Sequence, residues 1–191
     1  MKDDVSVATI AETAASEGAY DRRTILLHWI TAALVALLWG IAQVIDLFPK
    51  GAPRIAVRSV HIVLGVLLGV ILVTRIVWRA RSGRRLPPAN QGVMGYCARI
   101  VHVVLYVGVA SVVLLGISNA WARGDFLFSL WRIPKLYPDI PQLKPTIENL
   151  HATFANALII LAGAHALVAI AHHFILRDGV LRRMLPPRQG Q

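Results

Sequence analysis

Four long apolar stretches alternate with polar connections along the chain. They run from Thr24 to Ile45, from Ile55 to Trp78, from Ala98 to Ser118 and from Asn149 to Ile175. A helix needs about 20 apolar residues to cross the hydrocarbon core of a bilayer, and none of the four stretches contains Asp or Glu. The pattern predicts an all-α fold, an integral membrane four-helix bundle with up-down topology.

The composition supports a membrane protein. Of the 191 residues, 56% are apolar and 16% are charged, whereas about 25% of the residues of soluble domains are charged. The predicted spans form one domain over residues 22–179, between a flexible N-terminal tail (1–21) and a basic C-terminal tail (180–191). The N-terminal tail is acidic and lacks a short apolar core, so it does not have the pattern of a secretory signal peptide.

The net charge of +10 is distributed unevenly between the two sides of the predicted bundle. Thirteen Lys and Arg residues lie in the tails and the middle connection, with Arg75 at a helix end included, and seven lie in the other two connections. The more basic side usually faces the cytoplasm, so both termini are expected there. No continuous basic face with groove-reading elements is visible, which argues against nucleic-acid binding. The single Cys97 excludes an internal disulfide or a multi-cysteine cluster.

Histidines within the spans are the candidate chemistry, because polar side chains are costly in a membrane and often functional there. The last span, HATFANALIILAGAHALVAIAHH, carries His151 and His165 fourteen residues apart. In a helix, this spacing leaves the two imidazoles within about 40° of one face and roughly 21 Å apart along the axis. One helix therefore offers metal-binding nitrogens at two depths.

Other spans offer partners at the same two depths. His28 lies at the level of His165 on the expected cytoplasmic side, and His61 lies at the level of His151 on the external side. Zinc sites usually gather three or four ligands in one place. Paired imidazoles among small residues instead favour haem iron held axially in a four-helix bundle. No CxxCH sequence is present, so the haem would be b-type. With both axial positions filled, such iron transfers electrons and has no open site for oxygen.

Three segments resemble one known family. They are HWITAALVALLWG, SVHIVLGVLLGVILVTRIVWR and the ending AHHFILRDGVLRRMLP, and they are similar to the bacterial cytochrome b-561 family of four-helix, two-haem inner-membrane proteins over about residues 20–187. The resemblance implies axial ligands at His28 and His165 for a cytoplasmic-side haem b (protohaem IX) and at His61 and His151 for an external one. It also implies electron exchange with ubiquinone, and some members oxidise superoxide at the periplasmic side.

Several other polar residues are candidates for roles near the haems. His102 has a depth similar to that of His28 and could replace it as the partner of His165. Arg75 and Arg79 could pair with the inner haem propionates, or could extend to the lipid head groups. His172 and His173 could hold a propionate or a quinone oxygen, or could form interfacial hydrogen bonds.

Two functions fit these features, with a structural or transport protein without redox activity as a third. The first is an oxidoreductase that takes an electron from a small external donor, for which the resemblance makes superoxide a candidate, and passes it to membrane quinone. The second is a membrane anchor that relays electrons for a dehydrogenase, a hydrogenase or a cytochrome c. Its docking surface would be the external connection from Asn119 to Glu148, in which the segment FLFSLW is expected to lie on the membrane surface as an aromatic cap.

Overall fold

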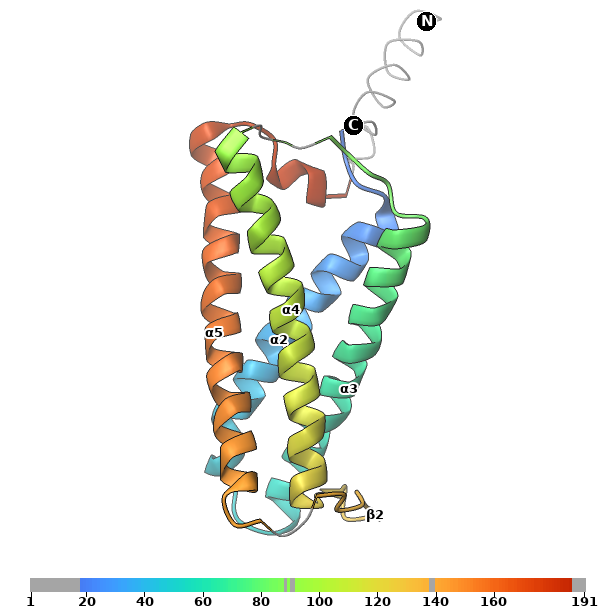
Figure 1. Ribbon diagram of the computed structural model, residues 1–191, viewed down its shortest axis with the longest axis vertical. Helices are drawn as coiled ribbons and strands as arrows, with labels where there is room; N and C mark the ends of the chain where they lie inside the picture. The colour runs from blue at the N-terminus through green and yellow to red at the C-terminus, as the bar shows by residue number, and fades with distance from the viewer. Residues whose placement is uncertain (1–17, 88, 90–91, 138–139, 187–191) are drawn as a thin grey trace, which may run out of the picture.

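The computed structural model describes residues 18–87, 89, 92–137 and 140–186, and the ends of both predicted tails, 1–17 and 187–191, lie outside this part. It contains four long helices that run alternately up and down (Figure 1). They are α2 (Arg22–Val44), α3 (Ala52–Arg81), α4 (Gly92–Arg123) and α5 (Leu143–Ala171). Each is long and apolar enough to cross a membrane. The predicted four-helix membrane bundle is confirmed.

The helices extend beyond the predicted apolar spans, because backbone hydrogen bonding continues into the interfacial region where the side chains become polar. α4 includes six residues before Ala98, and α5 begins at Leu143 instead of Asn149. α5 ends in a π-helical turn, η2 (His172–Leu176). Two short 3₁₀ helices, η1 (Ile45–Leu47) and η3 (Leu181–Met184), follow α2 and η2.

The helices pack in the cyclic order α2, α3, α4, α5, with the closest packing between α4 and α5 and the sparsest between α2 and α5. α3 and α5 are therefore diagonal neighbours. The buried core lies midway along the bundle, between the two predicted histidine levels. It consists of Leu34, Leu38, Leu68, Leu72, Val109 and Leu158.

One end of the bundle, called here the hairpin end, carries a short β-hairpin. The segment expected as a surface cap forms β1 (Phe126–Leu127) and β2 (Trp131–Arg132), which pair antiparallel. Ser59 on α3 is fully buried and holds this hairpin. Its Oγ donates toward the backbone carbonyl oxygens of Ile55 and Phe126, and it accepts a hydrogen bond of 2.8 Å from the backbone N–H of Phe128.

The opposite end, called here the terminus end, joins residues near both ends of the chain. The N–H of Tyr20 donates to the carbonyl of Arg183 (3.0 Å), and Trp29 Nε1 donates to the carbonyl of Met184 (2.8 Å). Arg183 Nη1 also donates to the carbonyl of Pro87. The described parts of both predicted tails therefore belong to the folded bundle.

Asp21 connects three segments at the terminus end. Its carboxylate caps α2 by accepting from the N–H and the hydroxyl of Thr24. It also accepts from Trp78 Nε1 at the end of α3 and from the N–H of Arg84 beyond it. Burial raises the pKa of Asp21, but the hydrogen bonds from Thr24, Arg84 and Trp78 outweigh burial and lower the pKa to about 2.

We expect Asp21→Ala to destabilise the bundle by about 1 kcal/mol or more, since an N-cap alone contributes that much. Because the carboxylate has a lowered pKa in the folded state, its contribution is present above about pH 4 and is lost as the pH falls toward 2. Thermal unfolding in detergent at several pH values measures both effects. The control is Asp46→Ala, because Asp46 is 85% exposed in its ion pair with Arg54 and should contribute little. A melting-temperature difference between wild type and Asp21→Ala that stays constant down to pH 2.5 would contradict this role.

Candidate functional site

The hairpin-end pair consists of His61 on α3 and His151 on α5. Their ring centroids are 6.2 Å apart with an interplanar angle of 83°, and the rings approach one another from diagonal helices. Two imidazoles that share one metal at about 2 Å per bond have centroids roughly 6 Å apart. The separation of this pair therefore suits two axial ligands of one metal.

Within the described chain, one nitrogen on each ring of this pair has no hydrogen-bond partner. His151 Nδ1 lies 3.1 Å from the carbonyl oxygen of Val112 on α4. His61 hydrogen-bonds the backbone of Leu38 on α2, and its Nδ1 is buried without a partner. A metal-bound imidazole typically donates its second N–H to a carbonyl in this way. The orphaned nitrogen of His61 and the anchored ring of His151 fit a haem ligand pair.

Glycines shape the space around this pair. A Cβ at Gly116 on α4 would lie 3.1 Å from Cε1 of His151, so the absence of a side chain lets the ring pack against α4. A Cβ on Gly40 or Gly65, by contrast, would have no neighbour within 4 Å. Both glycines are half-buried, so the space directly beside each backbone is not filled by a neighbouring side chain.

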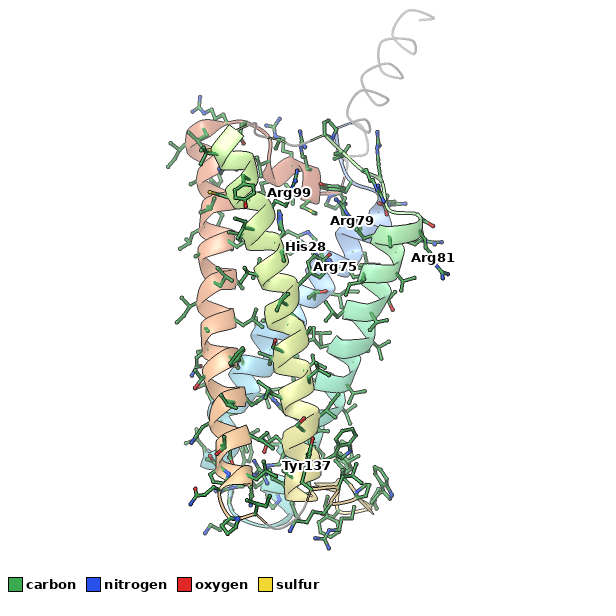
Figure 2. The ribbon with its side chains drawn as sticks, viewed as in Figure 1. His28, Arg75, Arg79, Arg81, Arg99 and Tyr137 are labelled. Carbon is green, nitrogen blue, oxygen red and sulfur yellow. The ribbon has the colours of Figure 1, made fainter. Side chains whose placement is uncertain are left out.

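Three histidines gather at the other level, toward the terminus end. The rings of His102 on α4 and His165 on α5 are in edge contact, with centroids 5.3 Å apart. His28 on α2 lies in the same neighbourhood, but its Nδ1 is 3.0 Å from Nη2 of Arg75 (Figure 2). Because a guanidinium only donates, His28 Nδ1 accepts this hydrogen bond. Among the described residues, the ring contact of His165 is with His102 and not with His28.

Arg75 and Arg79 have different surroundings. Arg75 is half-buried inside the bundle and stacks 4.9 Å from the ring centroid of Tyr106. It has no ion pair with a carboxylate in the described part of the chain, which is costly for a cation at membrane depth. Arg79 lies at the surface, 5.0 Å from the ring centroid of Tyr20. Arg75 is therefore the better placed of the two for an anionic group bound inside the bundle.

Comparison with known sequences decides the family. The profile of the family "Prokaryotic cytochrome b561" matches residues 19–187. The chain belongs to this family. It is also 30% identical over 101 residues to "Cytochrome b561 homolog 1" of Escherichia coli (strain K12). That alignment covers 52% of this chain and 57% of the relative, so the chain spans little more than half the length of the curated relative it matches.

Members of the prokaryotic cytochrome b561 family are membrane electron-transfer proteins that bind b-type haem. The two histidine levels are consistent with this cofactor, since haem takes two axial nitrogens instead of a cluster of ligands. The described residues contain no group of three or more His, Cys, Asp or Glu side chains that could hold a metal ion.

The two remaining histidines are occupied by neighbours within the chain. His172 is buried, and its Nδ1 hydrogen-bonds Asp178 just beyond the π-helical turn. The hydrogen bond from His172 lowers the pKa of Asp178, which lies outside the membrane span. His173 packs edge-on against the ring of Phe174. The structure brings neither of these rings into contact with His28, His102 or His165 within the described chain.

Sequence analysis did not single out the groups that position these rings. The carbonyl of Val112 and the small residue Gly116 hold His151, and Tyr106 contacts Arg75. The position of Gly116 in its span matches the depth of His151, which is a signal that a depth comparison can detect. By contrast, every residue has a backbone carbonyl, so the sequence could not show that His151 bonds the carbonyl of Val112.

We expect Gly116→Val to displace the His151 ring and to weaken haem binding at the hairpin-end site by about tenfold or more, as when an outer partner of a metal ligand is lost. Pyridine haemochrome analysis of the purified protein measures haem per chain. The control is Gly163→Val, because Gly163 is exposed and a Cβ there meets nothing within 4 Å. Equal haem content in Gly116→Val and wild type would show that this close approach is unimportant.

Proposed function

We propose that this cytochrome b561 binds two b haems and carries electrons to ubiquinone from superoxide or another small donor at the hairpin end. The observation that carries the proposal is the arrangement of α5, where His151 and His165 lie at two levels with other histidines nearby at each. The apolar core lies between the levels and excludes water from the middle of the bundle. Bound haem would supply one-electron redox chemistry at each level.

The hairpin-end haem is assigned to His61 and His151. The assignment is supported by their ring separation, the unpartnered nitrogen of His61 and the carbonyl-bound nitrogen of His151. A bond from His151 to Val112 fixes the ring orientation and makes the second nitrogen available to iron.

The terminus-end haem is assigned to His165 and His28. These residues lie on α5 and α2, the two neighbouring helices with the sparsest packing, so a macrocycle separates fewer existing contacts there than between α4 and α5. His102 is the alternative partner, favoured by its direct ring contact with His165. In the first assignment, Arg75 gives up its bond to His28 and is the proposed partner of a haem propionate.

Arg79, His102, His172 and His173 remain predicted contacts for a propionate or for ubiquinone. Quinone reduction consumes two electrons and two protons, whereas each superoxide supplies one electron and leaves as dioxygen. Two superoxide anions, one quinone and two protons thus yield two dioxygen molecules and one quinol. The protein must therefore accept electrons one at a time and deliver two, which two haems make possible.

We further propose that this protein lies in the bacterial inner membrane with its terminus end in the cytoplasm, because the more basic side of a membrane protein normally stays inside. The hairpin end would then face the periplasm. Its basic residues still outnumber its acidic ones, but several are held by neighbours. Arg58 and Arg123 both pair with Asp125, and Arg54 pairs with Asp46. Lys50 and Lys144 are exposed and make no ion pair within the described chain, so they are best suited to attract an anion.

A membrane anchor that relays electrons for a partner protein is the second candidate. The hairpin favours it, because Leu130 is 90% exposed and Trp131 is 60% exposed at the tip. Ser59 holds this apolar tip in a fixed place, and exposed aromatic groups on a fixed support are typical of interfaces. A partner protein retained in stoichiometric amount through purification would favour this function over the first.

We expect purified protein to contain two b haems per chain and to show dithionite-reducible absorption. His61→Ala and His151→Ala should each remove the same haem, and His165→Ala should remove the other. His28→Ala should match His165→Ala if His28 is the ligand, whereas His102→Ala should do so if His102 is. Lys50→Ala is the control, because Lys50 is exposed in a turn outside the helices, and it should leave haem content unchanged. A colourless protein, or full haem content in His151→Ala, would refute the assignment.

We expect the double variant Lys50→Glu/Lys144→Glu to reduce the rate of haem reduction by superoxide about 3- to 10-fold at low salt, because it removes electrostatic attraction. The difference should shrink as ionic strength rises. Stopped-flow spectroscopy measures the rate. The control, Arg85→Glu/Arg182→Glu, makes the same change in net charge at the terminus end and should have little effect. Equal slowing in both double variants would rule out local steering.

A further inference from the structure

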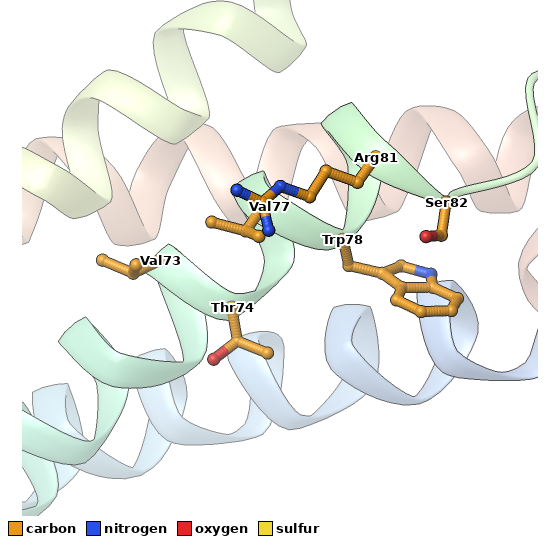
Figure 3. Close-up of a pocket in the computed structure, with 6 residues that line it drawn as sticks. All are labelled: Val73, Thr74, Val77, Trp78, Arg81 and Ser82. Atoms are coloured by element: carbon orange, nitrogen blue, oxygen red, sulfur yellow. The ribbon is translucent and has the colours of Figure 1, made fainter.

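A groove lies on the outer side of α3 near the terminus end (Figure 3). It has a volume of about 320 Å³. Residues of α3 and its C-cap line it: Val73, Thr74, Val77, Trp78, Arg81 and Ser82. Because no other helix contributes to the lining, the groove opens toward the surrounding lipid and not toward the histidines. It is separate from the candidate haem sites.

The lining changes from apolar to charged along the helix axis. Val73 and Val77 lie deeper in the span than Arg81 and Ser82. From Val73 to Arg81 the helix rises about 12 Å toward the terminus end, at 1.5 Å per residue. Trp78 lies between them, and tryptophan is enriched at the depth of the lipid head groups. A molecule that fits this gradient has an apolar tail and a polar head.

Arg81 points to the charge of that head. Its side chain extends back along α3 toward Val77, over the groove, and it lies on the side of α3 that faces away from the other helices (Figures 2 and 3). The guanidinium is exposed, and within the described part of the chain it makes no hydrogen bond, ion pair or ring contact. A cation directed toward the membrane interior is costly unless an anion neutralises it. The groove therefore presents a positive charge without a counter-ion.

The residues around Trp78 do not neutralise the positive charge of Arg81. Trp78 forms the wall of the groove and is fixed from behind, since its Nε1 donates to Asp21 and the guanidinium of Arg23 stacks 4.7 Å from its ring centroid. The carboxylate oxygens of Asp21, which bind Trp78, also accept from Thr24 and Arg84. The wall is thus rigid, and the local acid is committed elsewhere.

We propose that this groove binds an acidic phospholipid, with the phosphate on Arg81 and an acyl chain along Val73 and Val77. Basic residues at the membrane surface attract anionic lipids, and a guanidinium can bind two phosphate oxygens at once. Ser82 lines the terminus end of the groove and offers a hydroxyl there. Ubiquinone also has an apolar tail, but its head carries no negative charge and would leave Arg81 without a counter-ion.

The test uses haem-loaded protein freed of bound lipid in detergent, to which dioleoyl phosphatidylglycerol or dioleoyl phosphatidylcholine is added. Native mass spectrometry measures the bound lipid. We expect phosphatidylglycerol to bind more tightly than phosphatidylcholine, and Arg81→Gln to weaken its binding about fivefold. Arg81→Lys should retain part of the affinity. An unchanged haem spectrum in each variant would show that the bundle is intact, so this result does not depend on the proposed electron donor or acceptor.

The matched control is Arg99→Gln, because Arg99 is also exposed near the terminus end but lies on α4, outside the groove (Figure 2). It should change phosphatidylglycerol binding less than twofold. Equal losses in Arg81→Gln and Arg99→Gln would show general attraction by net charge and would overturn the proposal. Equal binding of the two lipids would do the same, as would displacement of phosphatidylglycerol by decylubiquinone.

Discussion

Polar groups inside a membrane bundle need partners within the protein, because hydrocarbon offers none. In this chain, histidines of α5 and of neighbouring helices find such partners by hydrogen bonding to the backbone or, in one case, to a guanidinium. His151 binds the carbonyl of Val112, His61 binds the backbone of Leu38, and His28 binds Arg75. Each of these bonds joins two different helices. The bonds therefore fix how the helices are rotated against one another, which apolar packing alone does not specify.

The apolar core and the histidine levels depend on this rotation. With His151 turned toward α4 and α3, the residue midway between the two histidines, Leu158, packs into the core with Leu68 and Val109. Gly108 permits this close contact, since a Cβ there would lie 3.1 Å from Leu158 Cδ1. α5 thus carries histidines at two levels and the apolar core residue Leu158 between them. An electron carrier benefits from this order, because dry protein between the levels keeps water and protons away from the middle of the path.

The sequence was sufficient to predict the features that depend on depth. Hydropathy locates the four spans, and a constant rise per residue places His61 level with His151 and His28 level with His165. Depth does not determine direction around the helix axis, so it could not show that the ring of His102 contacts His165 while His28 turns to Arg75. The hairpin was also missed. Its pairing depends on Ser59, which lies 67 residues from Phe126 in the chain, and a short aromatic segment does not reveal such a distant partner.

The two ends of the bundle use their charged residues differently, and this difference bears on the direction of electron flow. At the hairpin end, Arg58, Arg123 and Glu148 are linked through ion pairs that include Asp125, which is only 12% exposed. Such shielded pairs hold loops in place and leave little net charge. At the terminus end, Arg81 and Arg99 have no hydrogen bond or ion pair within the described residues. Uncompensated arginines are typical of the side of a membrane protein that stays inside the cell, which supports the proposed orientation. In that orientation the hairpin end would meet a donor from outside, and the histidine pair nearest to it, His61 and His151, would be the first that such an electron reaches.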